Sequence, residues 1–286
     1  MNQSDQAEES SREEREIADE RFGLGLARAF GGAIVFSLPM LMTMEMWWLG
    51  FYMSSWRLAL LLAVNIPLLI GLSHYIGFED TFEFKDDALD AFVAYAVGFI
   101  APVPILFLFG VIEPGMSADE IIGKISLQAV PGSIGAMLAQ SELGGQPKDK
   151  EDRKRRAGYW GELFIMMVGA LFLAFNLAPT EEMVLIAYMM TDWHILGLIL
   201  FTLIVMHAFV YALEFKGQAS IPEGTPFWSV FLRFTVVGYT IALLISLFIL
   251  WMFGRLDGQS LYQIVTAVIV LGFPAAIGAA AARLIL

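Results

Sequence analysis

Residues 240–253 read TIALLISLFILWMF, and only Thr240 and Ser246 in this run carry polar side chains. The run has no polar face at helical spacing, which a helix on the surface of a water-soluble protein needs. Residues 196–210, LGLILFTLIVMHAFV, share this property. Several runs of the chain exceed the about 18 apolar residues that cross a bilayer as a helix. The sequence therefore predicts an all-α membrane protein rather than a soluble helical bundle.

The composition of the whole chain supports this class. Of its 286 residues, 58% are hydrophobic and 16% are charged, against about 45–50% and about 25% in soluble domains. The apolar runs predict eight transmembrane helices, of which the fourth is the most polar because Lys124, Ser126 and Gln128 interrupt it. The predicted spans cover residues 24–44, 56–77, 88–112, 117–141, 158–178, 193–215, 226–253 and 260–286.

Two parts of the chain share a pattern of residues, which predicts an internal repeat. One set recurs 137 positions later: Thr43, Glu45, Met53 and Trp56 match Thr180, Glu182, Met190 and Trp193. Another recurs 143 positions later: Ser117, Ile121, Pro131, Ile134, Gly135 and Ala136 match Ser260, Ile264, Pro274, Ile277, Gly278 and Ala279. The sequence thus predicts two parallel four-helix repeats. Transporters and channels built from repeats place their sites at the repeat interface.

The positions of Lys and Arg predict the orientation in the membrane. Residues 148–156 hold six of the 17 basic residues, and cationic loops are retained in the cytoplasm. An even number of crossings separates this run from each terminus, so both termini are predicted to be cytoplasmic. The expected organisation is a disordered acidic cytoplasmic tail (1–22), a first membrane repeat (23–142), a basic cytoplasmic linker (143–157) and a second membrane repeat (158–286).

Charge and motif content exclude several functions. The net charge is −12, and a protein that binds nucleic acid needs a basic face, so no nucleic-acid partner is expected. The chain contains no His-Glu-x-x-His helix, no Gly-rich phosphate loop and no Gly-x-Ser-x-Gly elbow. The sequence therefore predicts no enzymatic activity and no cofactor. Three histidines without any cysteine leave little for a zinc site, but carboxylates are able to supplement them, so metal binding stays open.

Glu45 and Glu182 are the strongest candidates for a functional site. A carboxylate near lipid depth is costly and tends to face the bundle interior or water. The repeat supplies one carboxylate from each half, and a convergent pair is able to share a proton or to hold a cation. The alternative is structural. Residues 179–182, PTEE, form a favourable helix start, with a threonine cap and acidic residues at the positive end of the helix dipole.

Five further residues are candidates for a pathway or a gate. Lys124 and Gln128 lie one turn apart and are expected to face the bundle, where Lys124 pairs with an acidic residue of the same helix start or of the site. Pro131 and Pro274 each interrupt a helix, which either exposes carbonyl groups or forms a packing joint. His207 lies in an apolar helix, where it either titrates near neutrality or serves as a hydrogen-bonded structural residue.

Residues 38–50, LPMLMTMEMWWLG, resemble a bacterial family of integral membrane proteins of unknown function. The similarity extends over most of the chain after the N-terminal tail. This resemblance implies a prokaryotic inner-membrane protein, and it supplies no activity, no cofactor and no site residue.

These features predict a channel or a secondary transporter for a small cation or for protons. Acidic residues gather at the predicted outer ends of the helices, and such a surface raises the local concentration of cations. On this hypothesis Glu45 and Glu182 bind the cation or proton. The alternative is a non-transporting membrane scaffold or sensor that acts through its cytoplasmic tail and loops. Small residues on the fourth and eighth helices predict either a homo-oligomer or close packing between the two halves.

Overall fold

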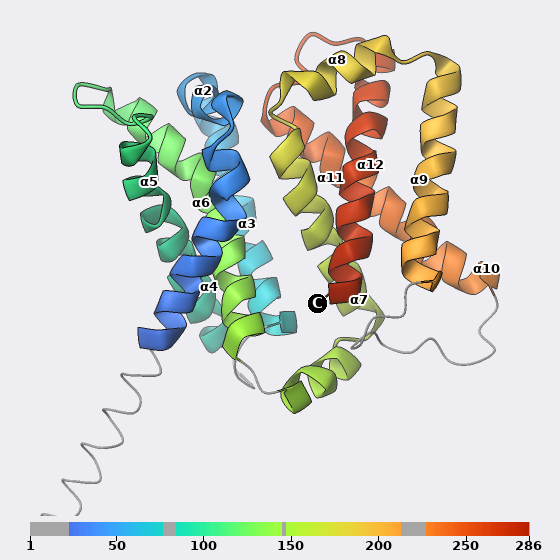
Figure 1. Ribbon diagram of the computed structural model, residues 1–286, viewed down its shortest axis with the longest axis horizontal. Coiled ribbons are helices and arrows are strands. Elements are labelled where there is room, and N and C mark those ends of the chain that lie inside the picture. Colours follow the sequence, from blue (N-terminus) through green and yellow to red (C-terminus); the bar gives the residue numbers. More distant parts are fainter. Residues whose placement is uncertain (1–22, 77–83, 145–146, 213–226, 286) are drawn as a thin grey trace, which may run out of the picture.

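The computed structural model of the protein describes residues 23–76, 84–144, 147–212 and 227–285, and every regular element within these ranges is a helix (Figure 1). The prediction of an all-α membrane protein is confirmed, because eight of these helices are long and apolar enough to cross a bilayer. The eight spans are Gly23–Leu41, Ser55–Tyr75, Phe84–Leu108, Ala118–Ala139, Gly158–Leu177, Asp192–Phe209, Phe231–Met252 and Leu261–Arg283.

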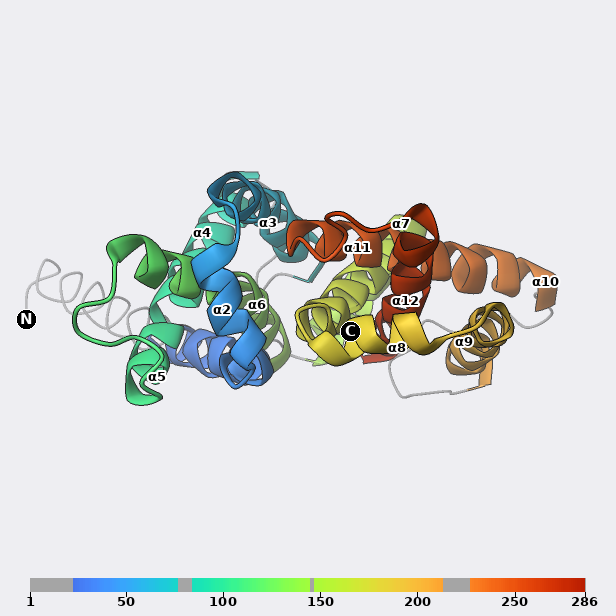
Figure 2. The same cartoon turned by 90° about the horizontal axis from the view of Figure 1, so that it is seen from above.

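The spans are arranged in two halves that lie side by side (Figure 2). The first half contains the span Gly23–Leu41, α2 (Met44–Tyr52), α3 (Ser55–Ile76), α4 (Phe84–Ile100), α5 (Pro102–Leu108) and α6 (Ala118–Gly144). The second contains α7 (Pro147–Leu177), α8 (Glu181–Met189), α9 (Asp192–Ala212), α10 (Phe227–Val230), the π-helical segment η1 (Phe231–Val236), α11 (Val237–Met252) and α12 (Leu261–Ile285). In each half a span, a short helix and three further spans follow in that order. That the two halves are parallel repeats of each other stays a prediction.

The third span is not one uninterrupted helix, as the sequence analysis expected for residues 88–112. It starts earlier, at Phe84, and a turn at Ala101 separates α4 from α5. Pro102 begins α5. Proline has no N–H to continue the hydrogen-bond ladder and restricts the residue before it, which accounts for the break.

The predicted linker at residues 143–157 is largely helical. Helix α6 continues to Gly144, and α7 begins at Pro147. Gly158 interrupts α7 with a φ of 57° and a ψ of −167°, so it separates the linker part of the helix from the membrane span. Glycine adopts a positive φ at little cost because it has no Cβ. The predicted tail, residues 1–22, lies outside the described residues.

Each half is closed by one crossing of its first and last spans. In the first half Gly32 faces Gly135, and in the second Gly169 faces Gly278. A Cβ atom at any of these glycines would overlap the carbonyl oxygen of the facing glycine, so only glycine permits this approach. The small residues of α6 and α12 are therefore used for packing inside each half, rather than between the halves as the sequence analysis considered.

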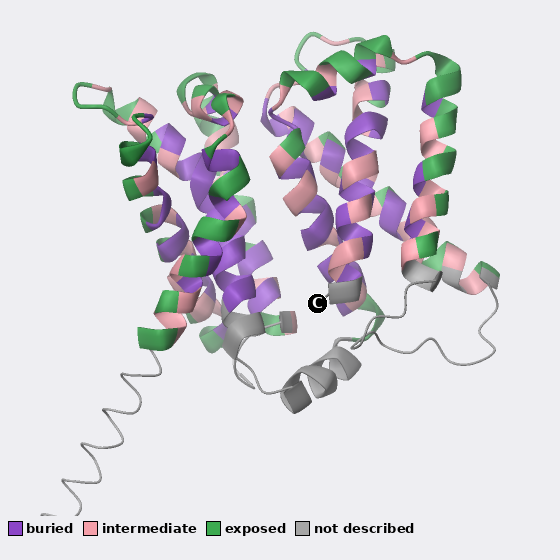
Figure 3. Cartoon of the chain, viewed as in Figure 1, coloured by how far each residue is buried: buried purple, intermediate pink, exposed green. Residues whose placement is uncertain are grey.

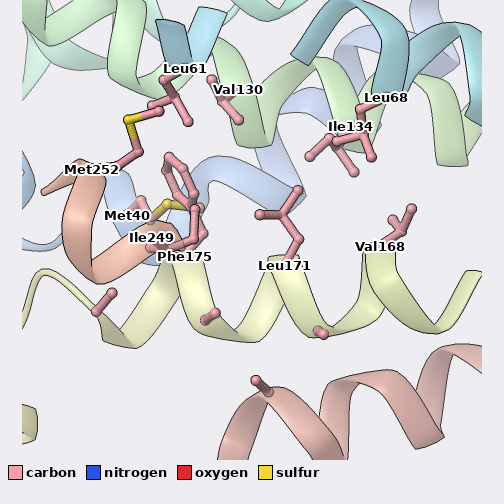
Figure 4. Close-up of a cluster of buried hydrophobic side chains, with 14 of the residues drawn as sticks. Met40, Leu61, Leu68, Val130, Ile134, Val168, Leu171, Phe175, Ile249 and Met252 are labelled. Atoms are coloured by element: carbon pink, nitrogen blue, oxygen red, sulfur yellow. The ribbon is translucent and has the colours of Figure 1, made fainter. Parts of the chain in front are cut away.

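The two halves meet along an apolar contact surface, which we call the seam. Buried residues fill the inside of each half and the faces that meet, while exposed residues cover the periphery (Figure 3). The rings of Phe36 and Phe172 contact each other across the seam, with their centroids 4.9 Å apart and their planes tilted by 57°. Figure 4 shows the buried side chains around the seam, which include Met40, Leu61, Leu68, Val130 and Ile134 of the first half and Val168, Leu171, Phe175, Ile249 and Met252 of the second.

Candidate functional site

Glu45 and Glu182 lie in the first turns of the short helices α2 and α8. Helix α2 packs on α6 of the first half, and α8 packs on α12 of the second. Glu45 is half-buried and Glu182 is exposed, and neither side chain forms a hydrogen bond or an ion pair in the described part of the chain. Both carboxylates thus lie at helix starts, as the structural alternative in the sequence analysis predicts. A joint role for them in binding stays a prediction.

The threonines before these carboxylates do not act as side-chain caps. Thr43 and Thr180 occupy the N-cap positions of α2 and α8, but their hydroxyl groups form no capping hydrogen bond. The Thr43 hydroxyl donates to the Pro39 carbonyl at 2.6 Å, and the Thr180 hydroxyl donates to the Leu177 carbonyl at 2.8 Å. Each hydroxyl therefore satisfies the end of the preceding span. Thr180 occupies the expected N-cap position of α8, but its side chain does not form the capping hydrogen bond.

Lys124 is buried in the first half beside the start of its own helix. Its ammonium nitrogen lies 2.7 Å from Glu120 Oε1, 2.9 Å from the Val111 carbonyl oxygen and 3.4 Å from Met116 Sδ. The Lys124 residue is 8% exposed, and α2 covers it closely, because a Cβ at Gly50 would lie 2.7 Å from the Lys124 backbone. The i,i+4 spacing of Glu120 and Lys124 places the two charges on one face of α6.

Further buried polar groups follow along α6. Gln128 donates to the Met40 carbonyl at 3.3 Å. Deeper in the half, Asn65 donates to Ser133 Oγ at 2.8 Å, and the Ser133 hydroxyl donates to the Val130 carbonyl at 2.9 Å. The side-chain oxygens of Gln128 and Asn65 are buried without a hydrogen-bond partner among the described residues.

Helix α12, which corresponds to α6 in the second half, lacks this polarity. In the 143-position correspondence, Lys124, Gln128 and Ser133 match Ala267, Leu271 and Ala276. Of the eight spans, the one in α6 is the most deeply buried and also the least apolar. The two halves therefore differ in chemistry although their elements follow the same order.

Pro131 and Pro274 lie inside α6 and α12. Near Pro131 the crossing with α4 is tight, because a Cβ at Gly98 would lie 2.6 Å from the Ala129 carbonyl oxygen and from the Ser133 nitrogen. Pro274 is followed by two fully buried alanines. This environment favours the packing-joint interpretation of both prolines.

His207 lies in the second half, apart from Lys124 and Gln128. Its Nδ1 atom is 2.9 Å from Thr235 Oγ1, and its ring lies 5.3 Å from the Phe231 ring. These contacts join α9 to η1, so they favour the structural role of this histidine. The structure does not bring the candidate pathway residues into one cluster, because Lys124, Gln128 and Pro131 share α6 while His207 and Pro274 belong to the second half.

A polar group at one end of the seam was missed by the sequence analysis. Arg57, at the start of α3, forms two hydrogen bonds to Asp257 of the second half, at 2.7 Å and 2.8 Å. The Arg57 guanidinium also lies 5.7 Å and 5.5 Å from the ring centroids of Trp56 and Trp251. Arg255 donates to the Pro179 carbonyl beside this pair. Arg57 and Asp257 are 200 positions apart, so no local sequence pattern predicts their contact.

The Arg57–Asp257 pair makes the seam sensitive to acid. The hydrogen bonds from Arg57 lower the pKa of the Asp257 carboxyl from its ordinary value of 3.8. The pair therefore stabilises the fold fully above pH 3.8, and this contribution is lost as the pH falls through the lower folded pKa. Because the Asp257 side chain is 58% exposed, we expect an effect of at most about 1 kcal/mol. Melting temperatures of the native protein and of Arg57→Met should converge at low pH, and an unchanged difference would contradict this assignment.

At the opposite end of the first half, a buried carboxylate faces a serine and a histidine. The Ser73 hydroxyl donates to Asp87 Oδ1 at 3.1 Å, and His74 Nδ1 lies 3.2 Å from Asp87 Oδ2. Residues 77–83, which precede α4, lie outside the described residues. Within the described ranges, no group of three or more His, Cys, Asp or Glu side chains is arranged to hold a metal ion.

Comparisons with known proteins agree with the membrane architecture. A family model described as "Putative integral membrane protein (DUF2391)" matches residues 25–286. No curated protein and no solved structure matches the chain. The family match covers nearly all of the chain, including both halves and every span. The chain therefore belongs to this family of integral membrane proteins.

Proposed function

We propose that this protein is a secondary transporter for protons or a small cation, and that its path runs through the first half along α6. The observation that carries this proposal is the buried Lys124 in the most enclosed span. Lys124 lies in the second turn of α6, and a charged side chain that is buried within a membrane span is costly and tends to mark a functional site. The corresponding helix α12 has an alanine at this position, and its buried charge, Arg283, lies instead in the last turn, where it pairs with Glu162 at 2.8 Å. The fold alone therefore does not require a charge at the position of Lys124.

The surroundings of Lys124 have the chemistry of a cation site. A carboxylate oxygen of Glu120, the carbonyl oxygen of Val111 and the sulfur of Met116 surround the ammonium group. Oxygen ligands of this kind also bind small metal cations. In the proposed cycle the Lys124 ammonium group moves away from Glu120, and an incoming cation or proton takes its place beside the carboxylate.

Groups deeper along α6 extend the proposed path. The buried side-chain oxygens of Gln128 and Asn65 have no hydrogen-bond donor in the described part of the chain, so they are able to accept one from a hydrated ion or water. Pro131 lacks an N–H and leaves the Leu127 carbonyl without its usual helical partner. In this proposal Glu45 and Glu182 attract cations to the outer end instead of binding them as a pair.

The test is flux in proteoliposomes under imposed gradients of protons, sodium, potassium and calcium in turn. We expect flux of one ion in the native protein and none in the double variant Glu120→Gln, Lys124→Met, which removes both charges together. The matched double variant Glu45→Gln, Glu182→Gln should keep most of its flux. Loss of flux only in the second variant would move the site to the two short helices. No flux from folded, inserted native protein would refute transport.

The second candidate is a non-transporting membrane scaffold or sensor, and the apolar seam favours it (Figure 4). A cavity of about 400 Å³ lies in the seam at this level, but Asn65 is the one polar residue of its lining, so its wall offers little to a hydrated ion. This candidate requires the cytoplasmic tail and the basic segment 148–156, so deletion of residues 1–22 should abolish function while the Glu120 and Lys124 variants retain it.

A further inference from the structure

A cavity of about 330 Å³ opens at the end of the seam where α3 begins and α11 ends. Both halves contribute to its wall. The first half supplies Tyr52, Met53, Ser54 and Arg57, and the second supplies Met252, Phe253, Gly254, Arg255 and Asp257. This volume lies within the usual range of about 300–1,000 Å³ for small-ligand sites.

The charges around this cavity do not balance. Asp257 accepts hydrogen bonds from both terminal nitrogens of Arg57, so these two charges compensate each other. Arg255 has no carboxylate within 4.0 Å in the described ranges of the chain, and its only hydrogen bond there goes to the Pro179 carbonyl. The Nε atoms of Arg57 and Arg255 are buried and have no hydrogen-bond partner among the described residues. The cavity thus carries one uncompensated positive charge in a chain whose net charge is −12.

The position of the cavity at the end of the spans indicates which layer of the bilayer surrounds it. Tyr52 and Trp56 are exposed at this end of the seam, and exposed aromatic rings favour the headgroup layer of the bilayer. Lipid phosphates occupy that layer. The guanidinium group presents its N–H donors in a planar fork that matches phosphate oxygens.

We propose that this cavity binds a phosphate group, with Arg255 as the principal ligand and the compensated Arg57 at its side. The chemistry fits the phosphodiester of a lipid headgroup and a free phosphate ion alike. Because the two arginines belong to different halves, bound phosphate would bridge the seam next to the Arg57–Asp257 pair. This binding site does not depend on transport.

The experiment is native mass spectrometry of the full-length protein in a neutral detergent, with dissociation constants measured for three probes. The probes are dihexanoyl phosphatidylglycerol, dihexanoylglycerol, which lacks the phosphate, and inorganic phosphate. Arg255→Gln should weaken phosphatidylglycerol binding about tenfold, because one charge-assisted hydrogen bond is lost. Asp257→Asn should strengthen binding, because it removes the competing carboxylate. Arg233→Gln, at the opposite end of the spans, serves as the control and should change nothing.

Each outcome decides the proposal. Arg255-dependent binding of phosphatidylglycerol, without binding of dihexanoylglycerol or competition by inorganic phosphate, identifies a lipid headgroup as the ligand. Competition by inorganic phosphate supports the same site with a free ion as the ligand. Equal binding of the probe that lacks phosphate, or binding that is unchanged in Arg255→Gln, overturns the proposal. A weakening in Asp257→Asn equal to that in Arg255→Gln also overturns it, since misfolding alone would lower binding in both variants.

Discussion

Gly32→Ala should greatly reduce the amount of folded protein, whereas Gly31→Ala, one position away, should be tolerated. A Cβ at Gly32 would overlap the carbonyl oxygen of Gly135 and the Cβ of Ala139, while nothing lies within 4 Å of a Cβ at Gly31. Neither obstacle is the end of a flexible side chain, so the two helices themselves must separate. We expect a loss of about 3 kcal/mol or more, at the upper end of the cost of overpacking.

The measurement is the yield of monodisperse protein in mild detergent, together with its melting temperature. Gly169→Ala should repeat the loss in the second half, because it meets Gly278 in the same way, and Gly197→Ala should be harmless there, since it has open space. Equal melting temperatures for the Gly31 and Gly32 variants would mean that the first and last spans do not cross as closely as described.

Glu120→Gln should destabilise the first half, and a second change at Lys124 should restore it. Removing one partner of a buried ion pair costs about 3–5 kcal/mol, because the remaining charge is left buried without compensation. In that variant the Lys124 ammonium group keeps neutral acceptors, which are the Val111 carbonyl, the Met116 sulfur and the new amide oxygen at position 120, but it loses its negative partner. The side chain of Glu120 is 21% exposed, so the reverse variant, Lys124→Met, leaves a carboxylate that water reaches and should lose less.

Urea titration in mild detergent measures the free energies of unfolding. The double variant Glu120→Gln, Lys124→Met should recover to within about 1 kcal/mol of the native protein, because a neutral pair of similar volume replaces the ion pair. Additive losses in the double variant would show that the two charges do not compensate each other. Lys85→Met, which changes an exposed lysine at the start of α4, serves as the control.

The sequence predicted the class of fold and the number of spans because hydrophobic length is a local property of the chain. The spacing of Glu120 and Lys124 is local as well, and one helical turn brings them together. Pro102 and Pro104 also carried a signal for the break between α4 and α5 that was not used. Gly32 and Gly169 are separated by the same 137 positions as the first repeated set, so the recurrence of glycine there was available too.

The seam lay beyond prediction from the sequence. Arg57 and Asp257 meet only because α3 of one half lies beside the end of α11 of the other, and a single sequence contains no record of how two halves pack. Glu45 and Glu182 illustrate the same limit. Their matching positions follow from the repeat pattern, but the structure attaches one to α6 and the other to α12 through the short helices that carry them.

The glycine crossings also determine where this molecule is able to move. Where two glycine backbones touch, no side chain lies between the helices to change its rotamer. We therefore expect the first and last spans of each half to move together as one rigid unit. The seam is different, because mostly apolar side chains meet there and, among the described residues, the Arg57–Asp257 ion pair joins the halves at one end. We therefore expect any large motion to be a rocking of the two halves about the Arg57–Asp257 end, with the greatest displacement at the far end of the spans.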